Sequence, residues 1–176
     1  MENNLEKLGY KKVDIREVRE NSVTLFDNIW ALVTAGDSKK HNTMTISWGT
    51  LGELWNKDVV NVYVSSSRYT KSFMDNNDYF TVEFFPQEYK KALGYLGSHS
   101  GKDEDKIKKV NFTPIYPSDN TTAFAEGCLI IVAKKIYSHE FEVNKLDNDT
   151  KAFYNERQIG LHTMYIGEIV EVWTKE

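Results

Sequence analysis

The sequence predicts a mainly β fold, namely a β-barrel with peripheral helices. Six stretches show the alternation and the β-branched or aromatic content of strands, whereas three or four shorter stretches have helical spacing. Helices and strands do not alternate regularly, so a barrel is favoured over a βαβ wound sheet. The length of 176 residues suits one domain with a proper core, and we expect residues 1–176 to form a single domain.

The expected strands follow one another from residue 22 to residue 173. In the third, Val60, Val62 and Val64 fall on one face. Gly127 and Gly167 interrupt the last two runs and indicate bulges. The last run is expected to carry Ile166, Glu168, Val170 and Val172 on one face. The six ranges are 22–36, 42–48, 58–66, 79–85, 121–143 and 163–173.

Helices are expected between these strands. The stretch 68–77 follows three serines, so Ser66 or Ser67 is the expected N-cap. Residues 101–110 are expected to form a mostly solvated helix, and residues 147–157 a short helix opened by Asp147 or Asp149. In the stretch 87–96, a helical stripe contains Tyr89, Leu93 and Leu96.

Composition excludes several classes of protein. The formal charge of −4 argues against a nucleic-acid binder, and no apolar run approaches the ~20 residues needed to span a bilayer. The first residues are charged and lack the apolar stretch of a signal peptide. Cys128 is the only cysteine, so nothing implies an oxidising compartment. A cytoplasmic protein without nucleic-acid or membrane partners is expected.

The common catalytic and metal motifs are missing. The four histidines are scattered, with no pair at ligand spacing, so no metal site is expected. No GxGxxG motif follows a strand, and no GxSxG or HExxH motif occurs. The stretch GSHSGKD resembles a Walker loop, but its glycines are too close and Asp103 stands where Ser or Thr should follow the lysine. A nucleoside triphosphatase is therefore rejected.

Two polar stretches have the residue types that bind phosphate. In SSSRYTKS, residues 65–72, a strand end precedes an expected helix start, where Ser67, Arg68 and Thr70 offer hydroxyls and a cation. On pattern alone, an ordinary capped helix with exposed basic residues is the more frequent outcome. In GSHSGKDEDK, residues 97–106, Lys102 and Lys106 are four apart and suit one helix face, although most such charge runs are solvated.

The strand 42–48 leaves a similar choice open. Thr43, Thr45 and Ser47 alternate with Met44, Ile46 and Trp48, so one face carries hydroxyls and the other is apolar. The hydroxyls either face water or hold a ligand, and alternation does not decide between these. The nearby tryptophans, Trp48 and Trp55, either wall a pocket or pack in the core.

The combination NTMTISWGTLGELW, then VYVSSSRYTKSFM, then LGSHSGKDEDK resembles the flavin reductase-like family with the FMN-binding split barrel, which includes flavoredoxin. The stretch HTMYIGEIVEVW is similar to the closing strand of that family, and the resemblance runs from about Asn28 to Trp173. It implies a Greek-key split barrel that works as a homodimer with FMN near the subunit interface. Lys102 stands in place of a common arginine, and Glu104 in place of a frequent small residue.

The resemblance also implies a set of cofactor-binding residues. The flavin would be lined by the strand 42–48, and its phosphate held by the other two stretches. His162 would face the site or the partner subunit. The residues are Asn42, Met44, Thr45, Ser47, Trp48, Ser67, Arg68, Tyr69, Thr70, Ser100, Lys102, Lys106 and His162.

The implied function is an FMN-binding oxidoreductase that passes electrons from NADH or NADPH through FMN to free flavin or another acceptor. The flavin carries the chemistry, so no catalytic side chain is expected. One alternative is an FMN-binding electron-transfer or sensor protein without NAD(P)H turnover. Another is a β-barrel binding module with no cofactor, which would not need the basic residue Arg68.

Overall fold

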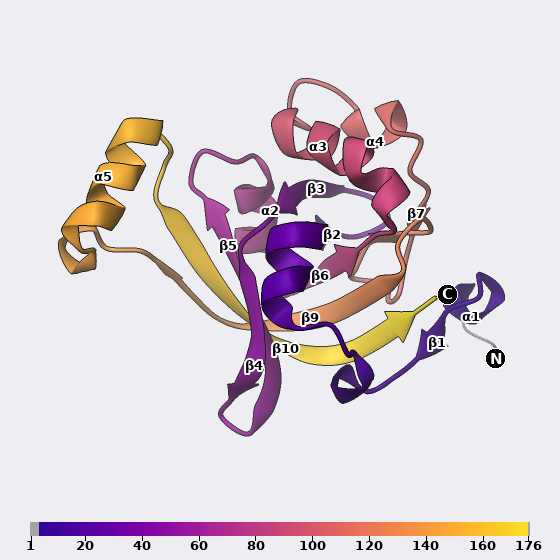
Figure 1. Cartoon of the computed structure of the whole chain (residues 1–176). Helices are drawn as coiled ribbons and strands as arrows, with labels where there is room; N and C mark the ends of the chain where they lie inside the picture. The colour runs from indigo at the N-terminus through magenta and orange to yellow at the C-terminus, as the bar shows by residue number, and fades with distance from the viewer. Residues whose placement is uncertain (1–3, 176) are drawn as a thin grey trace.

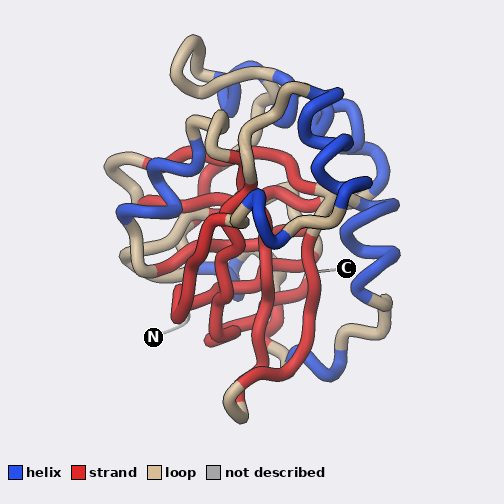
Figure 2. The backbone as a smooth tube through the Cα atoms, turned by 90° about the vertical axis from the view of Figure 1, so that its left-hand side faces the viewer, coloured by secondary structure: helices blue, strands red, loops and turns tan. Residues whose placement is uncertain are grey.

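The computed structural model describes residues 4–175 and contains a large curled antiparallel sheet (Figure 1) and a small two-stranded sheet of β7 and β8. The strand order of the large sheet is β3-β2-β6-β9-β10-β5-β4, with β1 paired to β10. Helices lie on the outside of the curled sheet (Figure 2), so the predicted mainly β fold with peripheral helices is confirmed. The strands are β1 Lys11–Lys12, β2 Ala31–Gly36, β3 His41–Ile46, β4 Gly49–Leu54, β5 Lys57–Ser65, β6 Tyr79–Phe84, β7 Pro114–Ile115, β8 Ala123–Phe124, β9 Leu129–Glu140 and β10 His162–Thr174.

Five α-helices and several shorter turns connect these strands. Helix α5 lies at the far end of the two longest strands, β9 and β10, away from α3 and α4 (Figure 1). The helices are α1 Asn4–Lys7, α2 Thr70–Asn76, α3 Lys90–Ser98, α4 Lys106–Lys109 and α5 Asn148–Arg157, with a π-helix at Thr24–Ile29 and 3₁₀ turns at Ile15–Glu17, Gln87–Tyr89 and Val143–Lys145.

The main core fills the inside of the curled sheet. Val60, Val62 and Val64 are fully buried there, so the predicted apolar face of β5 is confirmed. Burying a valine side chain stabilises a fold by roughly 1.5–3 kcal/mol. A second layer lies outside β2, where Leu93 and Leu96 of α3 pack in another buried cluster. The helical stripe predicted for 87–96 is therefore also confirmed, and it holds α3 against the sheet.

The strand predicted for 22–36 is wrong over its first half. Residues 24–29 form a π-helix, and the strand begins at Ala31. Leu25 and Phe26 are neighbours and both pack in the main core, whereas a strand would point them to opposite faces. The ring of Phe26 packs directly against Gly49, because a Cβ on Gly49 would lie 2.3 Å from Cε1 of Phe26.

The long strand predicted for 121–143 is interrupted. Its first residues form β8, and β9 begins only at Leu129. Between them, the Glu83 carboxylate occupies the space that a Cβ of Gly127 would need, with Oε1 2.0 Å from that position. Glu83 accepts hydrogen bonds from the Phe124 amide at 3.2 and 3.0 Å, which holds the break in place.

The bulge predicted at Gly167 is confirmed in β10. The register with β9 shifts between Ile166 and Gly167, where a Cβ would lie 2.5 Å from the ring of Phe80. A second shift follows between Ile169 and Glu171. The prediction that one face of this strand runs unbroken from Ile166 to Val172 is therefore wrong, and Val170 is 42% exposed.

Three helix starts differ in their agreement with the sequence. Asp147 accepts a hydrogen bond from the Thr150 amide at the start of α5, as predicted. Helix α2 begins only at Thr70, without a side-chain cap, so neither Ser66 nor Ser67 is its N-cap. Helix α4 is confined to residues 106–109 and is capped by Asp105, so Lys102 and Lys106 do not share a helix face.

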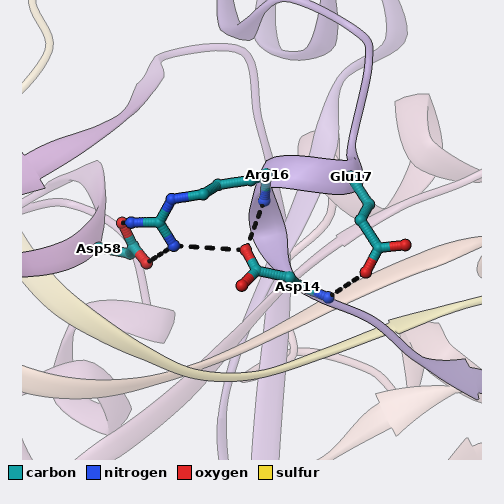
Figure 3. Close-up of polar contacts among 4 residues, drawn as sticks. All are labelled: Asp14, Arg16, Glu17 and Asp58. Atoms are coloured by element: carbon teal, nitrogen blue, oxygen red, sulfur yellow. Dashed lines mark hydrogen bonds and ion pairs between the residues drawn. The ribbon is translucent and has the colours of Figure 1, made fainter.

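No element was predicted for residues 11–17, and ion pairs attach this segment to the sheet. Asp14 and Glu17 form a capping box, and the guanidinium of Arg16 donates to both oxygens of Asp58 at 2.8 Å (Figure 3). Exposed pairs of this type contribute little to stability. Their effect is positional, because Asp58 belongs to β5 and the segment is thereby fixed beside the barrel.

The hairpin of β4 and β5 was also not predicted. A two-residue loop joins Leu54 to Lys57, and its residues Trp55 and Asn56 have φ values of 55° and 58°. Positive φ at both positions is the geometry of a type I′ turn. Trp55 is 60% exposed at this tip, so it neither packs in the core nor walls a pocket, contrary to both interpretations of the sequence.

Candidate functional site

A small cavity lies where β3, the start of α2 and the loop after α3 meet. Its volume is about 110 Å³. Seven of the thirteen residues predicted to bind cofactor lie around it, together with three that the prediction missed, namely Ser98, His99 and Gly101. None of these ten lining residues is acidic. The predicted members are Asn42, Ser67, Arg68, Tyr69, Thr70, Ser100 and Lys106.

Close packing across the cavity explains the glycine of the Ser-Gly-Lys loop. A Cβ on Gly101 would lie 2.1 Å from Oδ1 of Asn42, so no other residue fits without moving the amide. The Asn42 amide donates to the hydroxyl of Thr70 at 2.7 Å, and both side chains are buried. This contact joins β3 to α2 and fixes the cavity floor.

One buried and one half-buried cation give the cavity its charge. Arg68 donates through one Nη atom to the carbonyl of Gly97, and Lys106 donates to the carbonyls of Leu96 at 2.6 Å and His99 at 2.8 Å. Both side chains thus hold the end of α3, where helix carbonyls lack partners. Lys106 is only 2% exposed, so the prediction that its helix is mostly solvated is wrong at this residue.

Burial changes the acidity of both cations. It lowers the pKa of Arg68, and it lowers the pKa of Lys106 from 10.5 to about 8. The positive charge of Arg68 lowers the pKa of Lys106 further, while Glu104 acts in the opposite direction. Two like charges held in a cavity without an acid make it suited to an anion.

Ser67 is placed by the turn that follows β5. The hydroxyl of Ser65 lies 3.0 Å from that of Ser67 and donates to the carbonyl of Gly160 at 2.9 Å. The Ser66 amide donates to Leu161 at 2.8 Å. These bonds explain why the serines do not cap α2, since they connect the turn to the residues just before β10.

The strand 42–48 uses its faces differently from the prediction. Met44 and Ile46 pack in the main core, as expected of the apolar face. The hydroxyl of Thr45 donates to the carbonyl of Leu93 at 2.6 Å under α3, so it is already engaged, and Thr43 is fully buried. Ser47 is exposed beyond the end of β3. Met44, Thr45 and Ser47 do not line the cavity that holds Arg68 and Lys106, which we call the anion cavity.

An aromatic cluster lies on the other side of the serine turn. The ring centroid of Trp48 is 4.8 Å from that of His162 and 5.8 Å from that of Phe153. His162 pairs with Ser65 in the β5–β10 register, so the cluster adjoins the turn that carries Ser67. Trp48 remains 42% exposed and leaves an aromatic surface beside the cavity.

Lys102 is the remaining predicted residue. It is exposed in the turn before α4 and borders two open grooves next to the cavity, one of them shared with Arg68 and Lys71. Ser98 and His99 lie in the stretch 97–106 whose residue types suit phosphate, but neither was among the residues that the resemblance implied. The sequence prediction also missed Tyr154, whose hydroxyl lies 3.0 Å from Nδ1 of His162.

A family model described as flavin reductase like domain matches residues 24–176. The chain belongs to the flavin reductase-like family. This match spans both stretches that form the anion cavity and the strand that carries His162. No curated protein matches the chain by sequence.

Solved structures of this flavin reductase-like fold include several that are similar to the chain. Flavoredoxin from Methanosarcina acetivorans has a TM-score of 0.68 and 22% identity, over 94% of this chain and 76% of that one. An FMN-binding protein from Thermus thermophilus has a TM-score of 0.66 and 20% identity, over 84% and 70%. An NADH:FAD oxidoreductase from Streptomyces globisporus has a TM-score of 0.62 and 14% identity, over 85% and 83%.

These structures establish the fold. A protein from Shewanella frigidimarina with a split barrel domain also matches, at a TM-score of 0.66 and 17% identity over 93% of this chain and 76% of that one. The split barrel that the sequence resemblance implied is therefore confirmed. Within residues 4–175, no helix is long and apolar enough to cross a membrane.

Proposed function

We propose that this flavin reductase-like chain binds FMN and passes electrons from NADH or NADPH through it to free flavin or another acceptor. The observation that carries the proposal is the cavity lined by the half-buried Arg68 and the buried Lys106, which has no acidic lining residue. The family membership supports a flavin nucleotide as the molecule whose phosphate the cavity would bind.

The donor set of the cavity fits a phosphate group. Lys106 uses two of its three protons on carbonyls and retains one for a ligand. Arg68 engages Gly97 through one Nη atom, so other N–H groups of its fork stay available. Ser67 and Ser100 add hydroxyls to the lining, and Thr70 adds one at the buried floor. These residues would hold the phosphate of FMN.

The size of the cavity limits what it takes. Whole ligands occupy pockets of roughly 300–1,000 Å³, whereas this cavity measures about 110 Å³. It accepts a phosphate, and the flat ring must lie outside it. We place the ring on the side of the serine turn, where Ser47 is exposed and Trp48 and His162 offer an aromatic surface.

When bound, FMN supplies the acceptance of hydride and the release of electrons. The protein's own contribution is then to hold the phosphate and to orient the ring. The absence of a catalytic triad from the sequence agrees with this division. We also propose a homodimer, which is supported by the exposed apolar side chains of Trp48, Tyr137 and Val143 near the outer end of β9 and β10.

Binding of FMN is tested first by titration of the purified protein, with flavin fluorescence as the readout. Arg68→Ala should raise the dissociation constant roughly 10- to 100-fold, because a hydrogen bond to a charged group contributes about 1.5–3 kcal/mol. Lys91→Ala removes an exposed charge from α3 and should leave the constant unchanged. A protein that ignores added FMN, or an Arg68→Ala variant with wild-type affinity, contradicts the proposal.

Electron transfer is tested by anaerobic titration of the FMN-loaded protein with NADH and with NADPH. Loss of the flavin absorbance band on addition of either donor supports the oxidoreductase. A loaded protein whose flavin stays oxidised with both donors would instead be an electron-transfer or sensor protein. Sedimentation of the protein with and without FMN tests the dimer.

A further inference from the structure

Helix α5 makes two contacts with the aromatic cluster next to the anion cavity. The hydroxyl of Tyr154 lies 3.0 Å from Nδ1 of His162. The neighbouring residue, Phe153, has its ring 5.8 Å from that of Trp48. His162 is 8% exposed, and its ring lies between those of Trp48 and Tyr154. Two side chains of one helix therefore fix two side chains of the barrel.

Local sequence holds α5 in the position that these contacts need. Asp147 caps its first turn, and Gln158 ends it in the left-handed conformation with φ of 50°. The guanidinium of Arg157 lies 4.5 Å above the ring of Phe153. No residue of α5 is buried, so the contacts of Phe153 and Tyr154 are a large part of the packing of this helix against the barrel.

The hydrogen-bond partners of Tyr154 determine which nitrogen of His162 carries the proton. Burial raises the pKa of the Tyr154 phenol, so the hydroxyl keeps its hydrogen. A phenol is a stronger hydrogen-bond donor than a neutral imidazole N–H, and an imidazole nitrogen is a stronger acceptor than a phenol oxygen, so the hydroxyl donates to Nδ1 at 3.0 Å. Burial also lowers the pKa of His162, which favours the neutral ring. A neutral ring that accepts at Nδ1 carries its hydrogen on Nε2.

We propose that Tyr154 is a positioning residue that keeps His162 in the Nε2–H form, so that the ring presents a hydrogen-bond donor beside Trp48. Within residues 4–175, Nε2 makes no hydrogen bond of its own. A carbonyl oxygen at the edge of a flat heteroaromatic ring, as in a flavin or a nicotinamide, is the chemistry that this donor and the exposed Trp48 face would recognise together. The ligand part of the inference rests on the proposed function; the assignment of the proton does not.

The proton assignment is tested without any cofactor. Long-range ¹H–¹⁵N spectra of the full chain report the protonation of each ring nitrogen, and His162→Gln identifies the signals of His162 among the four histidines. The wild type should show an unprotonated Nδ1 and a protonated Nε2. Tyr154→Phe should produce a mixture of both forms, whereas Tyr116→Phe, at an exposed tyrosine outside the aromatic cluster, should change nothing. A wild-type ring protonated at Nδ1, or an unchanged Tyr154→Phe spectrum, overturns the proposal.

The consequence for the ligand is tested on the FMN-loaded protein. Loss of one neutral hydrogen bond corresponds to a change of roughly three- to tenfold, so Tyr154→Phe should slow flavin reduction by NADH or NADPH by about that factor. In a His162→Gln background the same substitution should have no further effect. A reduction rate equal to wild type in Tyr154→Phe, or equal effects in both backgrounds, overturns the positioning role. Failure of FMN to bind at all refutes the proposed function instead and leaves the spectra of the free protein to decide the tautomer.

Discussion

Replacing Lys106 by methionine isolates the charge of the anion cavity. Methionine keeps an unbranched stem in the buried position and removes the ammonium. The carbonyls of Leu96 and His99 lose a donor at every pH, which costs about 1–3 kcal/mol. Methionine also removes the free-energy cost of burying the ammonium, which stabilises the variant by an amount that depends on pH. The pH dependence of the stability difference therefore reports the charge alone.

The magnitude follows from the pKa. The folded-state pKa of Lys106 is about 8 and the ordinary value is 10.5. Between these values the unfolded chain binds more protons on this amine than the folded chain, so stability rises with pH. Linkage gives a rise of about 2 kcal/mol between roughly pH 7 and pH 9.5 from this group. Lys106→Met should lack that rise.

The assay is urea unfolding followed by tryptophan fluorescence at the two pH values, in a buffer without phosphate. Lys109→Met removes an exposed charge from the same helix and should keep the wild-type pH dependence. Added inorganic phosphate should reduce the pH dependence of the wild type, because a bound dianion raises the pKa of Lys106. Parallel curves for wild type and Lys106→Met would refute the claim that this amine is buried with a lowered pKa.

Three further substitutions test other parts of the structure. Burial raises the pKa of Glu83 well above its ordinary value, so the stability of the wild type should fall as pH rises above about 4.5. The amide oxygen in Glu83→Gln still accepts from Phe124, and the melting temperature of this variant should exceed that of the wild type by a margin that grows toward neutral pH. Gly167→Ala should destabilise the protein by about 1–3 kcal/mol in urea unfolding, because its Cβ would lie 2.5 Å from Phe80. Asp147→Ala should weaken the first turn of α5, seen as faster amide exchange there and unchanged exchange in β5.

Much of the sheet was predictable because one face of each strand packs in the core. The alternating valines of β5 and the bulge at Gly167 both follow from period-two burial. The π-helix at 24–29 was not predictable, because Phe26 is placed by its contact with Gly49, which is remote in sequence. Strand β4 was missed because two glycines dilute its alternation and its partner β5 holds it in place.

The candidate site was predictable in its charge and less so in its geometry. Arg68 and Lys106 were identified from motifs, yet their burial depends on the end of α3, which a single stretch does not encode. The engagement of Thr45 with Leu93 also joins residues 48 positions apart. The contact of Tyr154 with His162 depends on how α5 folds back, and no periodicity reports that.

The tip of the β4–β5 hairpin has a consequence for protein engineering. Left-handed backbone costs an ordinary L-residue roughly 1–2 kcal/mol, and Trp55 adopts it with φ of 55° while its side chain stays largely in solvent. Asn-Gly is the sequence that such a two-residue turn prefers. This turn therefore lowers the stability of the wild-type chain at a position remote from the anion cavity. Trp55→Asn combined with Asn56→Gly should raise the thermal stability.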